Sequence, residues 1–179
     1  MTTSTGSAPV TTRPGALRRA FAFPNPVNEY AARATAGIVV ALSLATFCLG
    51  LGAGWGWMLW IVALGFWLRV AGGPRYSPAG RLAVHVIAPR LGKPRLVPGP
   101  PKRFAQSIGA VLSTAAAVLW SAGLAPVAWA LLGLLVVAAS LEAFAGFCLG
   151  CWAFGRLQAA GIIPESVCEA CNNIALRRA

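Results

Sequence analysis

Long apolar runs constrain this chain more than any other feature of its sequence. Residues 35–51 and 57–70 are almost wholly apolar, and so are residues 104–122 and 127–154. A helix needs about 20 apolar residues to cross a bilayer, because each residue adds about 1.5 Å to its length. Each run reaches or approaches this length once its flanks are counted. The runs therefore predict four transmembrane helices and exclude a soluble helical bundle.

The basic residues all fall on one side of this arrangement. The chain has 15 Lys and Arg against four acidic residues, for a formal net charge of +11. Four Arg precede or begin the first run, eight Lys and Arg lie in residues 69–103, and three Arg follow residue 155. The two short turns carry none. The positive-inside rule then predicts a multi-pass plasma-membrane protein with both termini cytoplasmic, and no motif indicates a nucleic-acid partner.

The predicted fold is all-α: an integral membrane bundle of four transmembrane helices, arranged as two helical hairpins. A flexible cytoplasmic tail (residues 1–28), rich in Thr, Ser, Pro and Gly, precedes the first transmembrane hairpin (29–70). A basic cytoplasmic loop (71–103) leads to the second hairpin (104–156). A cysteine-containing cytoplasmic tail (157–179) follows. The lipid bilayer is the first partner that this organisation implies.

Capping signals mark two helix starts. Asn28 is placed to cap the first helix, with Glu29 in its first turn and Arg33 one turn further on as its ion-pair partner. Ser77-Pro78 combines an N-cap residue with proline at the first helical position. After it, apolar residues form a stripe opposite the polar ones, which predicts a short amphipathic interfacial helix in the central loop. The stripe consists of Leu82, Ala83, Val86 and Ile87, and it faces away from Arg81 and His85.

Two cysteine pairs carry the main candidate chemistry. Cys148 and Cys151 stand in the sequence FCLGC near the end of the last apolar run, and Cys168 and Cys171 repeat the C-x-x-C spacing in the tail. Along one continuous helix from Pro126, Cys148 lies about 33 Å away, at the cytoplasmic end. Both pairs are therefore expected at the cytoplasmic surface, each with its two sulfur atoms on one helix face.

Three interpretations of the cysteines stay open. Two C-x-x-C pairs separated by 16 residues match the spacing of four-thiolate zinc sites, which makes zinc a possible cofactor. The four thiols could instead exchange disulfides or carry sulfur, with Cys168 as the better nucleophile, because Cys151 is expected near a helix C-terminus that disfavours a thiolate. The third interpretation is packing, since Gly146 and Gly150 surround Cys148 in a G-x-x-x-G pattern.

Glu142 is the only acidic residue within a predicted span, about 22 Å from the outer turn. An intramembrane carboxylate indicates function by default. A structural ion pair or hydrogen bond is the favoured role, and the start of the third span supplies the candidate partners Arg103, Gln106 and Ser107. On a continuous helix Glu142 points away from both thiols of FCLGC, so it is a poor base for either.

Two further residues are assigned minor roles. Cys48 stands in a second FCLG sequence, residues 47–50, and is expected to be a buried thiol near the outer face. His85, the only histidine, is expected to be solvated on the interfacial helix.

Several of these motifs together resemble one family. The elements Asn25-Pro26-Val27-Asn28, Ser77-Pro78, APRLG at residues 88–92 and FCLGC resemble the small bacterial membrane proteins grouped as domain of unknown function 4395. The tail sequence VCEACNN, residues 167–173, is similar to that of actinobacterial members. The family has no settled activity. The resemblance implies a thioredoxin-like or rhodanese-like partner, because members are often encoded near such sulfur proteins.

The leading hypothesis is thiol/disulfide redox chemistry or sulfur handling with a soluble partner, in which Cys168 and Cys171 exchange with Cys148 and Cys151. One alternative is a non-catalytic membrane subunit or scaffold of a larger complex, with a structural four-cysteine zinc site. A third is a transporter of a small sulfur species or anion, which would need a homo-oligomer to form a path. Whether the protein is an enzyme stays open at this point.

Overall fold

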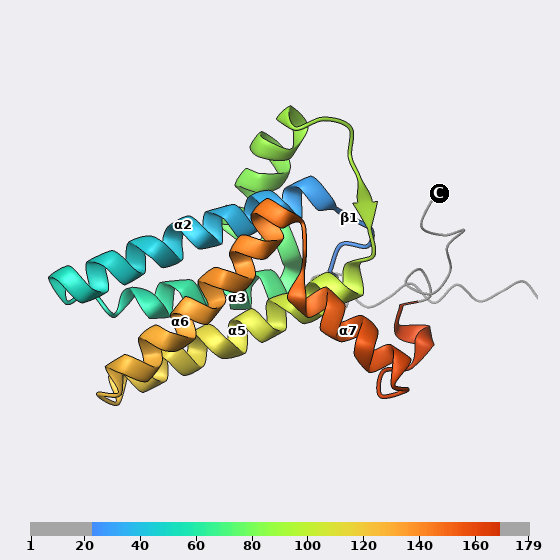
Figure 1. The fold of residues 1–179 in the computed structure, drawn as a ribbon. Coiled ribbons are helices and arrows are strands. Elements are labelled where there is room, and N and C mark those ends of the chain that lie inside the picture. Colours follow the sequence, from blue (N-terminus) through green and yellow to red (C-terminus); the bar gives the residue numbers. More distant parts are fainter. Residues whose placement is uncertain (1–22, 169–179) are drawn as a thin grey trace, which may run out of the picture.

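A computed structural model describes residues 23–168 of the chain. These residues are mostly helical, and four antiparallel helices form a bundle that a fifth helix leaves at an angle (Figure 1). The bundle helices are α2 (Glu29–Ala53), α3 (Met58–Gly72), α5 (Gly99–Ser121) and α6 (Ala125–Ser140), and the departing helix is α7 (Leu149–Ala159).

Three helical segments are long and apolar enough to cross a membrane: Glu29–Ala53, Gly99–Ser121 and Ala125–Ala145. Helix α3 has 15 residues, which corresponds to about 22 Å and is shorter than a typical hydrocarbon core. By length and composition, three of the four predicted spans therefore qualify as candidates to cross a membrane.

The two hairpins of the sequence prediction are present. Gly54, with φ of 72°, ends α2 in the left-handed conformation, and Gly123, with φ of 82°, lies in the turn between α5 and α6. Left-handed backbone is available to glycine without strain, which explains its place at both turns. Both turns lie at one end of the bundle, and the central loop, the segment before α2 and α7 gather at the other end (Figure 1).

Helix α5 is the centre of the packing and contacts α3, α6 and α7. Small residues at four-residue spacing, Gly109, Ser113 and Ala117, are buried on one face of this helix. A methyl group at Gly109 would overlap the ring of Phe66 on α3. The small residues thus permit close approach of two helices.

The central loop begins a helix where the sequence indicated. The Ser77 hydroxyl accepts a hydrogen bond from the Gly80 backbone N–H at 3.2 Å. Helix α4 (Pro78–Leu82) continues into a π-helical turn, η2 (Ala83–Ile87), and a 3₁₀ turn, η3 (Ala88–Arg90). The side chains of Leu82 and Val86 are exposed. Another 3₁₀ turn, η1 (Gly73–Arg75), connects α3 to this segment.

The start of α2 is tied to the end of the loop by a feature that the all-α prediction omitted. Strands β1 (Val27–Asn28) and β2 (Leu96–Val97) form a two-residue antiparallel pair. Asn28 caps α2 as predicted, accepting the Tyr30 N–H at 3.0 Å. The predicted pair of Glu29 with Arg33 is wrong, because Glu29 binds Arg95, next to β2, at 3.0 Å.

The largest departure from the sequence prediction is a break in the last apolar run. Residues 127–154 were expected to form one helix, but α6 gives way to a π-helical turn, η4 (Leu141–Ala145), which ends at Gly146 with φ of 69°. The Gly146 and Phe147 backbone N–H groups both donate to the Leu141 carbonyl. The chain then starts α7 in a new direction, and Cys148 lies at its beginning rather than at a helix end.

Candidate functional site

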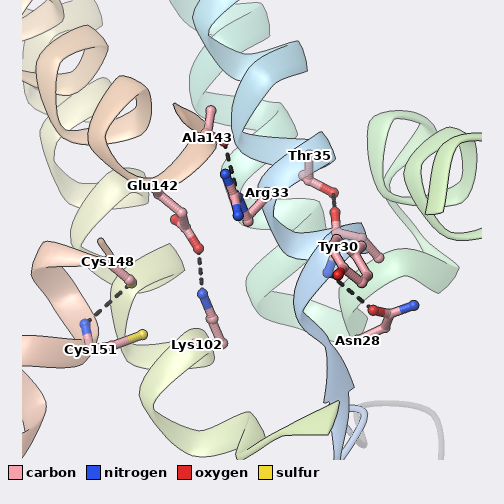
Figure 2. A network of polar contacts seen from close by, with 10 residues as sticks. Asn28, Tyr30, Arg33, Thr35, Lys102, Glu142, Ala143, Cys148 and Cys151 are labelled. Carbon is pink, nitrogen blue, oxygen red and sulfur yellow. Dashed lines mark hydrogen bonds and ion pairs between the residues drawn. The ribbon is translucent and has the colours of Figure 1, made fainter. Parts of the chain in front are cut away.

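Cys148 is the N-cap residue of α7. Its backbone is extended, with φ of −92° and ψ of 103°, and its sulfur atom accepts the Cys151 backbone N–H at 3.3 Å (Figure 2). A helix N-terminus presents unpaired N–H groups and a partial positive charge, which stabilise a thiolate. The prediction that the helix dipole opposes a thiolate in this pair is therefore wrong, because the helix begins here instead of ending.

A buried ion pair lies beside the two cysteines. Lys102 of α5 donates to a carboxylate oxygen of Glu142 in η4 at 2.6 Å, and both side chains are almost fully buried (Figure 2). Glu142 thus has a structural ion pair, as expected, but with a different partner from those predicted. Gln106 instead accepts a hydrogen bond from Arg69 at 2.9 Å, and the Ser107 hydroxyl donates to the backbone carbonyl of Arg103.

The environment makes the two thiols unequal. The hydrogen bond from the Cys151 thiol is the largest influence that lowers the pKa of Cys148, and the charge of Lys102 and the Cys151 backbone N–H lower it further, while burial and Glu142 oppose them. The same hydrogen bond, together with burial, raises the pKa of Cys151, because Cys151 is the donor of that bond and loses it on ionisation. Cys148 is therefore the thiol of the pair that ionises more readily.

The thiols are reached through cavities rather than from an open surface. Cys148 is only 9% exposed. Cys148, Cys151 and Lys102 line a cavity of about 500 Å³ between the start of α7 and the β2 segment. On its other side, Cys148 borders a mostly apolar cavity of about 330 Å³ among the bundle helices, together with Glu142 and Gln106. Cavities of this size have room for a small molecule or an extended peptide segment.

Arg33 is a residue of the site to which the sequence analysis assigned the wrong partner. From α2, its Nε donates to the Ala143 carbonyl at 3.1 Å (Figure 2). Its Nη2 donates to the Phe144 carbonyl at 2.9 Å. These carbonyls lie where the helix is interrupted, so Arg33 satisfies acceptors that the break leaves without helical partners. An arginine within the first two turns of a transmembrane helix was the available signal, because such a side chain needs a polar partner.

Of the second cysteine pair, the structure describes only Cys168. Cys168 follows a short 3₁₀ turn, η5 (Glu165–Val167), and is buried and disulfide-bonded. Cys48, Cys148 and Cys151 are free thiols, so none of them is its partner. Cys171 lies outside the described residues. Among residues 23–168, no three Cys, His, Asp or Glu side chains come together to hold a metal ion, and the four-cysteine zinc site, which includes Cys171, stays a prediction.

Two residues with minor predicted roles occupy different surroundings. Cys48 was expected to be buried, but it is exposed on the outer face of α2, because the helix turns this position away from the bundle. His85 is exposed, as expected, and it lines a cavity with several basic residues.

Comparisons with known proteins agree with the family resemblance. Residues 27–159 match the family model described as domain of unknown function (DUF4395). No curated protein and no solved structure matches the chain. The matched segment includes the whole helical bundle, the Lys102–Glu142 ion pair and both cysteines of FCLGC. Because the match extends over well more than half of its length, the chain belongs to the domain of unknown function 4395 family.

Proposed function

We propose that this protein crosses the plasma membrane four times, with both termini cytoplasmic and α3 as the fourth span. The outer faces of the bundle helices are apolar and exposed, which suits contact with lipid rather than water. Helix α3 follows α2 through a tight turn and exposes Trp60, Leu64 and Trp67. Tryptophans 55 and 57 at the turn suit the membrane–water boundary, and their position would extend this short span.

The segment from Pro78 to Arg90 is proposed to lie on the cytoplasmic membrane surface. Leu82 is 47% exposed and Val86 is 38% exposed. Apolar side chains that project from a short capped helix would enter the boundary between headgroups and acyl chains. The arginines around them, Arg75, Arg81 and Arg90, would face anionic headgroups.

The proposed activity is dithiol/disulfide exchange by Cys148 and Cys151 at the cytoplasmic end of the bundle. The hydrogen bond from the Cys151 N–H to the Cys148 sulfur at the start of α7 carries this proposal. It combines a nucleophile stabilised by a helix N-terminus with a second thiol three residues later. Packing alone does not require this arrangement.

The exchange takes place in two displacement steps. The Cys148 thiolate attacks one sulfur of a disulfide, a mixed disulfide forms, and the other sulfur leaves as a thiolate that takes up a proton. Cys151 then loses its proton and attacks the Cys148 sulfur, which releases the second thiolate of the substrate. The substrate disulfide gains two electrons and two protons, and the protein is left with a Cys148–Cys151 disulfide. The reverse direction oxidises a dithiol.

The partners are proposed to be the tail pair, Cys168 and Cys171, and beyond it a thioredoxin-like or rhodanese-like soluble protein, as the family resemblance implies. A tail on the same chain is held near the membrane, which raises its effective concentration at the site.

The stoichiometry of reaction with a chromogenic disulfide, dithiobis(nitrobenzoate), tests the proposal. In a chain with Cys48, Cys168 and Cys171 replaced by serine, the remaining pair should release two nitrothiolates and retain no adduct, since Cys151 displaces the second one. Adding Cys151→Ser should give one nitrothiolate and a stable mixed disulfide on Cys148, visible in the intact mass.

Two adducts retained on the unaltered pair would refute a resolving role for Cys151.

The tail is tested in a Cys48→Ser background, where a Cys168→Ser change should prevent transfer of the disulfide from the tail to the site. Elemental analysis of anaerobically purified full-length protein separates this proposal from the zinc scaffold, which predicts about one zinc per chain that is lost with Cys148→Ser. Ion uptake that is unchanged between vesicles with and without the protein would exclude the transporter.

A further inference from the structure

A third cavity, which shares Lys102 and Gln106 with the cavities beside the thiols but is not lined by either cysteine, combines buried positive charge with apolar walls. It has a volume of about 700 Å³ and lies between the first turns of α2 and the segment that contains α4 and η2. Four basic side chains line it: Arg69, Arg75, Arg81 and Lys102. Among the described residues that line it, none carries a carboxylate. The cavity therefore has an excess of positive charge without an internal counterion.

The buried guanidinium of Arg69 is the most informative feature of this cavity. Its side chain is held on one side by the ring of Phe66, with the guanidinium carbon 4.2 Å from the ring centroid, and on another by Gln106, which accepts the Nε hydrogen at 2.9 Å. Arg69 is 6% exposed, and its two terminal nitrogens form no hydrogen bond to any described residue. These nitrogens carry four N–H donors in a fixed planar fork, the geometry that matches carboxylate and phosphate oxygens.

The nearby carboxylate does not satisfy Arg69. Glu142 attracts Arg69 electrostatically, but its hydrogen bond goes to Lys102. A buried guanidinium with unused donors is unfavourable unless an anion or water supplies acceptors. The donors of Arg69 are thus fixed in place, border an open cavity and lack an anion from residues 23–168.

The rest of the cavity defines what kind of anion it suits. Arg75, Arg81 and His85 are exposed at its rim. Between the rim and Arg69, the wall is formed by small or apolar side chains, including Ala31, Ala32 and Val84. Three guanidinium groups without a carboxylate partner suit the charge and the several oxygens of a phosphate better than a single carboxylate. The apolar wall suits a ligand that also has a hydrocarbon part.

We propose that this cavity binds a phosphate ester with an apolar body, with the phosphate on Arg69 and the basic rim. The ester comes either from the headgroup region of an anionic phospholipid or from a soluble organic phosphate, and both share the recognised chemistry. The proposal concerns a different cavity from the dithiol site and holds whether or not the cysteines exchange disulfides.

Ligand-dependent melting of the detergent-purified full-length protein tests this site. Four probes are titrated: short-chain phosphatidylglycerol, short-chain phosphatidylcholine, phenyl phosphate and inorganic phosphate. A ligand that binds only the folded protein raises the melting temperature in a saturable way. Saturation by phosphatidylglycerol at a concentration at least about tenfold lower than by phosphatidylcholine supports a lipid source, since about tenfold corresponds to one charge-assisted contact. Saturation by phenyl phosphate but by neither lipid supports a soluble source.

The variants identify the site. Arg69→Gln should raise the half-saturating concentration by at least about tenfold. If Arg69→Gln does not fold, the exposed double change Arg75→Gln/Arg81→Gln gives the same test without altering the core. Lys93→Gln removes one exposed charge from the same loop outside this cavity and should leave binding unchanged. Equal stabilisation by both lipids without a response to phenyl phosphate overturns the proposal, and so does an equal loss of binding in Lys93→Gln.

Discussion

The sequence Phe-Cys-Leu-Gly occurs twice in this protein, and its two copies fold into different structures. Residues 47–50 lie within the continuous helix α2, where Cys48 is exposed on the outer face. Residues 147–150 lie where α7 begins, where Cys148 is buried and accepts a backbone N–H through its sulfur. Four identical residues thus give one thiol on a helix surface and one buried thiol that caps a helix N-terminus.

What separates the copies lies outside them. Before Cys48, α2 simply continues, and the Thr46 hydroxyl bonds back to the Leu42 carbonyl of the same helix. Before Cys148, Gly146 takes a left-handed conformation, and Arg33 from another helix binds the carbonyls of the preceding turn. The N–H groups that follow Cys148 are freed by the break. We therefore expect the reactivity of Cys148 to depend on the interruption of the helix more than on the cysteine-containing sequence itself.

Removing Arg33 should have the largest effect on the difference between Cys148 and Cys48. Arg33→Gln loses two hydrogen bonds donated by a charged group. We expect the protein to lose about 2 kcal/mol of stability. This value is near the low end for hydrogen bonds from charged donors, because one of the two bonds is exposed. Reaction of Cys148 with a disulfide reagent should slow toward the rate of Cys48. Unfolding in mixed micelles measures the first effect, and reagent kinetics in single-cysteine backgrounds measure the second.

Arg95→Gln is the control for Arg33→Gln. Its ion pair with Glu29 has a 73% exposed arginine side chain, so we expect a loss of less than about 1 kcal/mol and an unchanged Cys148 rate. If Arg33→Gln leaves both stability and rate at their original values, the contacts with Ala143 and Phe144 do not maintain the break.

Replacing Gly146 should have a smaller effect on stability. Gly146→Ala places a side chain at φ of 69°, which costs about 1–2 kcal/mol for an L-residue. The change favours a helix that continues through Cys148, so the reactivity of Cys148 should again approach that of Cys48. Gly133→Ala, in the interior of α6 with open space around it, should instead stabilise by about 0.5–1 kcal/mol. Destabilisation of the same size at both glycines would contradict the argument.

Much of the fold follows from local patterns in the sequence. The two helical hairpins and the caps at Asn28 and Ser77 depend on run length and neighbouring residues, and the structure contains each of them. The break at Gly146 was missed because apolar composition continues through it, and composition does not distinguish one helix from two. Gly146, a residue that readily ends a helix in the left-handed conformation, was the local signal for it.

The polar contacts of the site were harder to predict from sequence. Lys102 and Glu142 are 40 residues apart, and Arg33 and Ala143 are 110 residues apart. Which cation reaches which acceptor depends on the rotation and depth of packed helices, and these are tertiary properties. An ion pair or hydrogen bond at Glu142 could be predicted, because a carboxylate within an apolar run needs a polar partner. Which residue supplies that partner could not.

The smallest expected effect concerns the pH dependence of Cys148, and it tests whether the charges near α7 or the helix start alone activate the thiol. Thiolates react and thiols do not, so the rate rises with pH until it levels off above the pKa of Cys148. That pKa is lowered, and Lys102 lowers it while Glu142 raises it. Removing Lys102 should therefore shift the midpoint of the pH–rate profile upward, and removing Glu142 should shift it downward.

Lys102→Gln and Glu142→Gln in a chain whose only reactive pair is Cys148 and Cys151 provide the two profiles. Midpoints that do not move in opposite directions would leave the helix N-terminus and the Cys151 hydrogen bonds as the sole activating groups, and the ion pair as a purely structural contact between α5 and η4.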